Sequence, residues 1–197
     1  MHPQMNQDLA TDAGAHTIVL VEGTSDRHAV ETLARRRDRS LEAEGVRVVP
    51  MGGATNVGHF LRRFGPGGLD VRISGLCDAA EEGWFRRALG DAGLGGTLSR
   101  GEMAARGFHV CVADLEDELI RCLGTDRVER VAESQGELAS FRLFQRQPAQ
   151  RGRGLPDQLH RFIGTRSGRK HRYAGLLVDA LDPDRVPEPL DRLLGGL

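Results

Sequence analysis

The sequence contains few cysteines, a single lysine and no long apolar run, and these shortages narrow the classes of protein that it can encode. Its 197 residues include three cysteines, Cys77, Cys111 and Cys122, without the spacing of a metal site. They predict free thiols in a reducing cytoplasm. No apolar stretch of 18 residues is present, so no membrane-spanning helix is expected. Residues 1–15 lack the pattern of a secretory signal, and we interpret them as a disordered lead-in.

The charged residues are abundant but unevenly placed. The chain is 39% hydrophobic and 28% charged with a net charge of −1, which is typical of a globular protein of one domain with extensions. Residues 112–137 carry eight acidic side chains against three arginines, whereas residues 141–175 carry nine basic side chains against one acid, Asp157. This separation predicts a local site for polyanions. Lys170, the only lysine of the chain, lies in the basic segment.

Apolar runs alternate with helical patterns over the first two thirds of the chain. Strands are expected at 17–22, 46–51, 70–79 and 107–113, with helices at about 26–38, 53–64, 81–90 and 114–124. The alternation predicts an α/β fold with a mainly parallel sheet. A mobile loop is expected over glycine-rich 91–106. The later part reads as helices at about 126–134, 137–146, 155–163, 168–182 and 188–194. We therefore expect a lead-in (1–15), an α/β core (16–124) and a helical C-terminal extension (125–197) that carries the basic segment.

Acidic side chains follow three of the four expected strands. Glu22 ends the first strand and Asp78 the third, and Asp114 and Glu116 follow the fourth. Asp26 lies one helical turn after Glu22. In open α/β sheets, ligands bind beyond the carboxyl ends of the strands, so these carboxylates are expected to share one crevice. Oxygen ligands of this kind suit Mg²⁺, and such a metal can assist phosphodiester cleavage.

Each acid also has an ordinary structural interpretation. Glu22 can belong to a strand-to-helix turn, and Asp26 favours the dipole of the helix that it begins. Asp78 and Asp114 can act as helix N-caps. Because these acids are all expected at the same edge of one sheet, the metal site is the favoured interpretation.

The motifs "VLVEGTSDRHAV", "GLCDAAEE" and "DLEDEL" resemble the TOPRIM half of the OLD (overcoming lysogenization defect) nucleases. The resemblance covers about residues 16–182. It implies a Rossmann-like TOPRIM sheet of about four strands flanked by helices, followed by a helical C-terminal region. It also implies Mg²⁺ or Mn²⁺ as the cofactor and catalytic roles for Glu22 and Lys170. The metal ligands that it implies are Glu22, Asp26, Asp78, Asp114 and Glu116.

The chain departs from the family pattern at two points. The second acid of the Asp-x-Asp motif falls at Ala80, which cannot bind metal. The next residue, Glu81, can substitute as a ligand or be an ordinary first-turn helix acid. The sequence also lacks the Gly-x-x-x-x-Gly-Lys-Ser/Thr motif of the ATPase that OLD proteins join to this domain. A stand-alone module with a separate ATPase partner is therefore expected.

The basic segment is expected to bind the phosphate backbone of DNA with little sequence specificity. A solvated helix face is the alternative. Lys170 is placed to stabilise charge that develops at the scissile phosphate. The arginines predicted to contact the backbone are Arg142, Arg146, Arg151, Arg153, Arg166, Arg169 and Arg172.

These features together predict a cytoplasmic, divalent-metal-dependent nuclease that cleaves DNA and does not associate with membranes. Ala80 keeps open a degenerate TOPRIM module that binds nucleic acid or a partner ATPase without cleavage. An RNA-processing nuclease is a further alternative. The sequence leaves open the choice between DNA and RNA, one metal or two, the pathway, and the oligomeric state, a homo-oligomer included.

Overall fold

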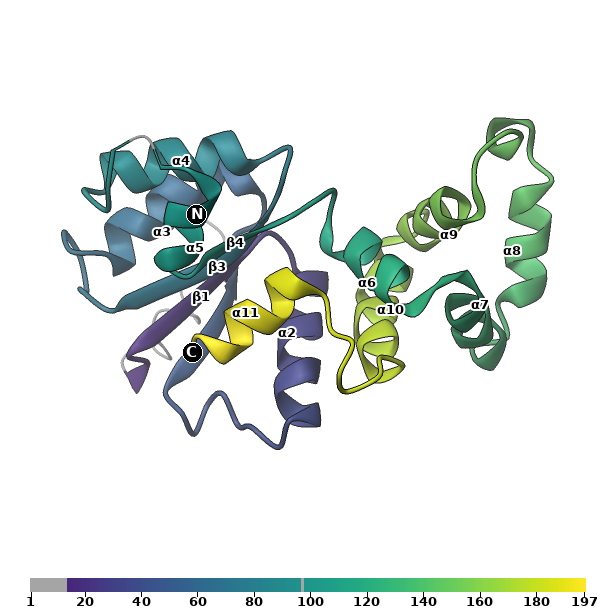
Figure 1. Ribbon diagram of the computed structural model, residues 1–197, viewed down its shortest axis with the longest axis horizontal. Coiled ribbons are helices and arrows are strands. Elements are labelled where there is room, and N and C mark those ends of the chain that lie inside the picture. The colour runs from purple at the N-terminus through teal and green to yellow at the C-terminus, as the bar shows by residue number, and fades with distance from the viewer. Residues whose placement is uncertain (1–13, 97) are drawn as a thin grey trace.

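A computed structural model of the protein describes residues 14–96 and 98–197, so most of the expected lead-in lies outside the described residues. The four strands form one parallel sheet in the order β2-β1-β3-β4 (Figure 1). They are β1 (Thr17–Val21), β2 (Val46–Pro50), β3 (Arg72–Asp78) and β4 (Phe108–Cys111). The predicted α/β class with a mainly parallel sheet is confirmed.

The central strand β1 is buried along its whole length because helices cover both faces of the sheet. Ile18 and Leu20 pack into a core with α3 (Val57–Phe64), α4 (Glu82–Asp91) and α5 (Arg100–Ala105). Val19 and Val21 pack into the opposite core with α2 (Thr24–Arg36). Full burial of one such side chain contributes roughly 1.5–3 kcal/mol, so this alternation fixes the strand between its two helical layers.

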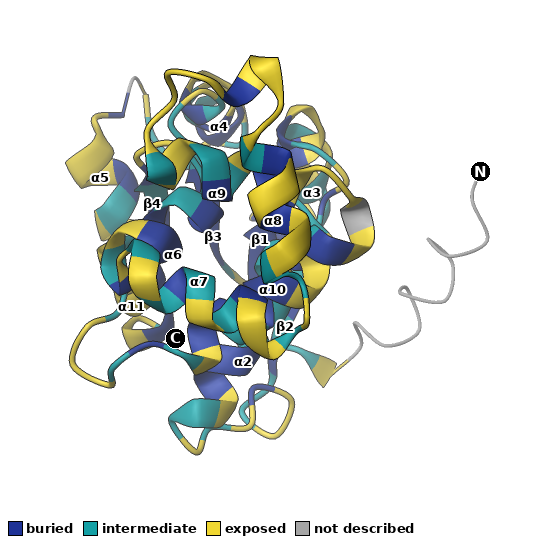
Figure 2. Cartoon of the chain, turned by 90° about the vertical axis from the view of Figure 1, so that its right-hand side faces the viewer, coloured by how far each residue is buried: buried dark blue, intermediate teal, exposed yellow. Residues whose placement is uncertain are grey.

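Helices α6 to α10, which we call the helical part, stand beside the sheet and follow β4 in the chain (Figure 1). Helix α10 returns along α2, where Gly175 allows close contact with the ring of His28. Helices α7 and α8 carry broad exposed faces (Figure 2). After the helical part, α11 (Glu188–Gly195) packs on β3 and β4. The members of the helical part are α6 (Leu115–Leu123), α7 (Thr125–Ser134), α8 (Leu138–Gln145), α9 (Leu155–Gly164) and α10 (Ser167–Asp179).

The prediction of a mobile loop at 91–106 is wrong for its second half, because residues 100–105 form α5. Ser99 begins this helix by accepting a hydrogen bond from the Glu102 backbone N–H at 3.3 Å, and the Glu102 side chain accepts from the Ser99 backbone N–H at 2.8 Å. This capping box stabilises a helix that was not predicted, because the segment around it is rich in glycine. The domain boundaries stay predictions. In the described part of the chain, none of the helices has the length and apolar character needed to cross a bilayer.

Candidate functional site

The predicted acids come together where the strands end. Glu22 follows β1, Asp78 is the last residue of β3, and Asp114 is the N-cap of α6. Burial, followed by the nearby carboxylates of Glu22, Asp26, Asp114 and Glu116, raises the pKa of Asp78 to about 8. Such mutual repulsion requires that the five side chains share one region. The structure therefore brings the five predicted acids into one region.

The turn after β2 fixes the backbone of Glu22. The Glu22 carbonyl oxygen accepts hydrogen bonds from the N–H groups of Gly52 at 3.0 Å and Gly53 at 3.2 Å. Gly53 has a φ of 123°, a conformation that residues with a Cβ rarely adopt. The glycine turn thus wraps around the end of β1, and two of its N–H groups already have partners within the protein.

Asp26 has both a structural contact and a place in the cluster. Its Oδ2 accepts a hydrogen bond from the Gly23 backbone N–H at 2.8 Å, which caps the first turn of α2. Burial raises the pKa of Asp26, the Gly23 bond and the Lys170 ammonium lower it, and the net shift is upward. The side chain therefore stabilises the start of α2 and also lies close to the other acids.

Asp114 already uses both carboxylate oxygens. Oδ1 accepts from the Asp117 backbone N–H at 2.8 Å, as expected of an N-cap, and Oδ2 lies 2.6 Å from Nε2 of His160 on α9. Burial raises the pKa of Asp114, but the hydrogen bonds from His160 and Asp117 outweigh it and hold that pKa below its usual value. The same contact raises the pKa of His160. A cation that bound Oδ2 would share this oxygen with His160.

Glu116 and Lys170 form an ion pair inside the cluster. The Lys170 Nζ lies 3.2 Å from Oε2 of Glu116, whose side chain is only 4% exposed. The geometry falls short of a hydrogen bond, so Oε2 remains a buried oxygen without a hydrogen-bond partner. Burial raises the pKa of Glu116 to about 7 despite the lysine. Burial alone would lower the pKa of Lys170, but the facing carboxylates, Glu116 first, raise it.

The region around Ala80 offers no obvious second ligand. Ala80 is exposed, and Glu81 is a half-exposed residue that precedes α4. Glu82 is buried, but its carboxylate binds Arg86 and, at 2.7 Å, Arg100. Of these neighbours, only Glu81 stays available as the predicted substitute.

The donor set suits a hard divalent cation, although its side chains are not gathered as a finished site. Among the described residues, no group of three acidic, histidine or cysteine side chains is already close enough to hold a metal. Two observations nevertheless fit one: the buried Oε2 of Glu116, which faces Lys170 without a hydrogen bond of good geometry, and the pKa of about 8 at Asp78. Both carboxyls hold protons readily without a cation, and both are oxygen ligands of the type that Mg²⁺ and Mn²⁺ use.

The predicted nucleic-acid-binding arginines divide into two groups. Arg169 is buried, with its Nε 3.1 Å from Glu137 and its guanidinium over the ring of Phe162, so the prediction of phosphate contact is wrong for this residue. Arg142 pairs with Glu129 at 2.5 Å, and Arg172 pairs with Glu137 at 2.9 Å. The remaining four are exposed and form no ion pair among the described residues: Arg146, Arg151, Arg153 and Arg166.

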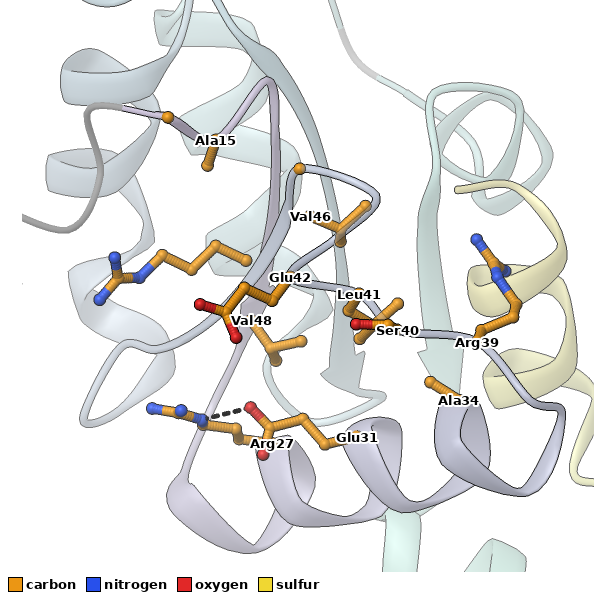
Figure 3. A pocket seen from close by; sticks show the side chains of 13 residues that line it. Ala15, Arg27, Glu31, Ala34, Arg39, Ser40, Leu41, Glu42, Val46 and Val48 are labelled. Carbon is orange, nitrogen blue, oxygen red and sulfur yellow. Dashed lines mark hydrogen bonds and ion pairs between the residues drawn. The ribbon is translucent and has the colours of Figure 1, made fainter.

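A pocket of about 590 Å³ lies away from these acids, between α2 and the edge strand β2 (Figure 3). An ion pair of 2.7 Å joins Arg27 and Glu31 on its α2 wall, and Val46 and Val48 line its β2 side. It contains none of the predicted site residues. The candidate site is therefore argued from the convergence of carboxylates and not from this pocket.

Comparison with known proteins agrees with this geometry. Residues 15–79 match the family model for the "Overcoming lysogenization defect protein-like, TOPRIM domain". The C-terminal region of the OLD protein of Xanthomonas campestris pv. campestris has a TM-score of 0.68 at 25% identity, over 92% of this chain and 93% of that one. Residues 15–79 are thus similar to an OLD-like TOPRIM domain. The C-terminal region of the Burkholderia pseudomallei OLD protein has a similar fold, with a TM-score of 0.67 at 22% identity over 92% and 96% of the two chains. No curated protein matches the sequence significantly.

TOPRIM domains in general bind divalent metals and occur in enzymes that process nucleic acids, so the match of residues 15–79 implies chemistry of this class. The family match ends at residue 79, just after Asp78, whereas the structural likeness extends over the helical part. Sequence reasoning missed His160, which is a single histidine in an amphipathic helix and carries no motif. Only the three-dimensional contact with Asp114 reveals its connection to the site.

Proposed function

We propose that this OLD-like TOPRIM protein is a divalent-metal-dependent nuclease that hydrolyses phosphodiester bonds of DNA. The observation that carries the proposal is the group of acids around Asp78 and Glu116. Their pKa values are raised to about 8 and about 7, and Lys170 lies 3.2 Å from the second. Carboxylates with strongly shifted pKa values cluster at functional sites. A bound cation would offset the repulsion between these acids.

Glu22, Asp26, Asp78 and Glu116 would hold the metal. Asp114 would act through its hydrogen bond to His160. This bond fixes the orientation of the Asp114 carboxylate beside the proposed metal. When bound, Mg²⁺ or Mn²⁺ would supply an activated water and stabilise the leaving oxygen. Whether Glu81 adds a ligand in place of Ala80 decides between one metal and two.

Lys170 would bind the scissile phosphate. Its ammonium remains charged because the facing carboxylates raise its pKa, and its side chain is 42% exposed, so a substrate can reach it. A fixed positive charge at this point stabilises negative charge that develops during cleavage. Exposed arginines at Arg146, Arg151, Arg153 and Arg166 would hold the backbone farther away.

The test is nicking of supercoiled plasmid DNA in Mg²⁺ or Mn²⁺ by the wild type and by two matched variants. Glu22→Ala removes the acid at the end of β1, and we expect it to lose at least about 100-fold in rate, beyond the usual effect of removing an outer partner of a metal ligand. Glu42→Ala removes an exposed glutamate beside the pocket of Figure 3 and should leave the rate unchanged. Equal nicking by Glu22→Ala and wild type would reject the assigned site.

Ala80 favours the alternative of a binding module without catalysis. In that case DNA binding would be salt-sensitive and no cleavage would occur in either metal. A substrate comparison between plasmid DNA and structured RNA tests the RNA-processing alternative. Association with a separate ATPase stays a prediction.

A further inference from the structure

Trp84 is an exposed aromatic residue on an otherwise well-packed helix. It is the only tryptophan of the chain, and 46% of it is exposed. The guanidinium of Arg87 lies 5.3 Å from the centre of its ring. Tryptophan is highly buried on average in folded proteins, so this exposure calls for an explanation.

The residues around Trp84 hold α4 in place. Phe85 is 1% exposed and packs into the core below the helix. The buried carboxylate of Glu82 binds Arg86 on the same helix and Arg100 at the start of α5. The helix is therefore anchored on two sides, and Trp84 is presented outward from a fixed support.

Trp84 lies near the carboxylate cluster. The Asp78 carbonyl accepts from the Glu81 N–H at 2.9 Å, and the Glu81 carbonyl accepts from the Trp84 N–H at 2.9 Å, so two consecutive hydrogen-bonded turns join them. Val112 is 62% exposed and follows β4 in the adjacent connection, beside the contact at which the Ala79 N–H donates to the Cys111 carbonyl at 2.9 Å. Exposed apolar side chains thus leave both β3 and β4 at the edge where the acids gather.

We propose that Trp84 stacks on an unpaired base of the nucleic acid, with Arg87 adding a positive charge beside it. This inference rests on the proposed nuclease function and specifies its substrate: a strand with at least one unstacked base near the bond that is cut. Aromatic faces bind bases of any sequence by stacking, and a cationic neighbour strengthens the contact. Bases inside a duplex are already stacked on each other, so intact duplex cannot use this surface.

The single tryptophan makes the contact directly measurable. Tyr173, the only tyrosine, is buried, so emission excited at the red edge of the spectrum reports on Trp84. We would titrate the full chain with a single strand of about 12 nucleotides, within the usual site size. The titration contains Ca²⁺ in place of Mg²⁺. Ca²⁺ binds the same oxygen ligands in a more flexible geometry, so it occupies the proposed metal site without the geometry of Mg²⁺. The single strand should quench the emission to saturation, and a duplex of the same sequence should not.

Two substitutions and a control separate stacking from folding. Trp84→Ala should weaken binding of the single strand by about 5- to 150-fold, measured by fluorescence anisotropy of a labelled strand, whereas Trp84→Phe should retain most of the affinity. Leu69→Ala is the control, because Leu69 is 56% exposed but precedes β3 at the other end of the sheet. Thermal unfolding should show all three variants folded.

The inference is overturned if Trp84→Ala binds as tightly as Leu69→Ala, if the strand binds without quenching, or if no strand binds. Emission that changes with protein concentration alone would also overturn it, because a second copy would then cover the ring. The two proposals fail separately. Quenching without plasmid nicking rejects the nuclease and keeps the stacking surface, whereas nicking with unchanged emission does the opposite.

Discussion

The carboxylate cluster has two halves that differ in their partners. The sheet-edge acids, Glu22, Asp26 and Asp78, form no ion pair with a basic side chain among the described residues. The α6 acids, Asp114 and Glu116, each face a basic side chain from the helical part. His160 lies 2.6 Å from the first and Lys170 lies 3.2 Å from the second.

This difference indicates where a cation is needed. The α6 acids are held in place by α9 and α10 whether or not a metal is bound. The sheet-edge acids are held by the backbone alone, through strand ends and the Gly23 contact of Asp26, and their mutual repulsion is not offset by ion pairs. A divalent ion would therefore stabilise the sheet-edge acids most, and Glu116 would link the two halves because its buried Oε2 also faces Lys170.

The largest expected effect on the nicking rate comes from replacing one acid of each half, in separate variants, with asparagine. Asp78→Asn keeps the shape but removes the charge of a sheet-edge acid, so plasmid nicking should fall by at least about 100-fold. Asp114→Asn should cost less, about 10- to 100-fold, because Asp114 acts through His160. Initial nicking rates at saturating Mn²⁺ measure both. A larger loss in Asp114→Asn than in Asp78→Asn would reverse the roles assigned to the two halves.

Replacement of Lys170 tests the basic partner of Glu116. Lys170→Met preserves the length of the side chain and removes its charge, and we expect kcat to fall about 100-fold, as for loss of one group that stabilises transition-state charge. Lys170→Arg should recover part of the rate, because the larger guanidinium keeps the charge but not the compact geometry. A fall in metal affinity with unchanged kcat would instead mean that Lys170 only orients Glu116.

The stability of the metal-free protein should depend on pH through Asp78. Its pKa is about 8 in the folded protein against 3.8 ordinarily, so between these values the folded state holds a proton that the unfolded state has lost. The free energy of unfolding therefore falls as pH rises through this window. Bound metal replaces the proton. A metal concentration of about 100 times the Kd at pH 8 should raise Tm by roughly 5–10 °C at pH 8, and the same concentration should raise it by less at pH 5.

Thermal unfolding with EDTA and with Mn²⁺ at several pH values measures this dependence, and Asp78→Asn is its control. The variant should show a shallower pH slope than the metal-free wild type, and the raised pKa values of Asp26, Glu116 and His160 account for the slope that remains. The lowered pKa of Asp114 adds stability that is lost as pH falls, which is opposite in sign to the effect of Asp78, whereas the raised pKa of His160 adds stability that is lost as pH rises. An unchanged slope in Asp78→Asn would show that another group controls it.

The sequence predicted the sheet-edge half better than the α6 half for a physical reason. Strand ends are set by local patterns, so the acids after 17–22 and 70–79 could be placed at one edge from topology alone. His160 and the hydrogen bonds of Asp114 depend on how α9 packs against α6, which is a contact between residues 46 positions apart. A capping pattern in the sequence predicted the N-cap but not the second partner.

The basic segment shows the same limit. Counting charges predicted seven equivalent arginines, but burial and pairing make them different. Arg169 packs over Phe162 and binds Glu137, which also accepts from the Tyr173 hydroxyl at 2.8 Å. The acidic segment and the basic segment therefore neutralise each other in part within the fold. Composition alone cannot separate an arginine that holds helices together from one that is free to meet a phosphate.

The smallest expected effect compares one arginine of each kind. Arg166 is exposed without a recorded ion pair in the described part of the chain, whereas Arg142 is held by Glu129 at 2.5 Å. Arg166→Ala should weaken DNA binding at every sequence and reduce the slope of log Kd against log salt by about 1. Arg142→Ala should leave the slope unchanged, because that guanidinium is already neutralised. Anisotropy titrations across a salt series measure both slopes. An equal change of slope in the two variants would mean that the Arg142–Glu129 pair opens when DNA binds. Ion pairing in the free protein would then not distinguish a structural arginine from one that binds phosphate.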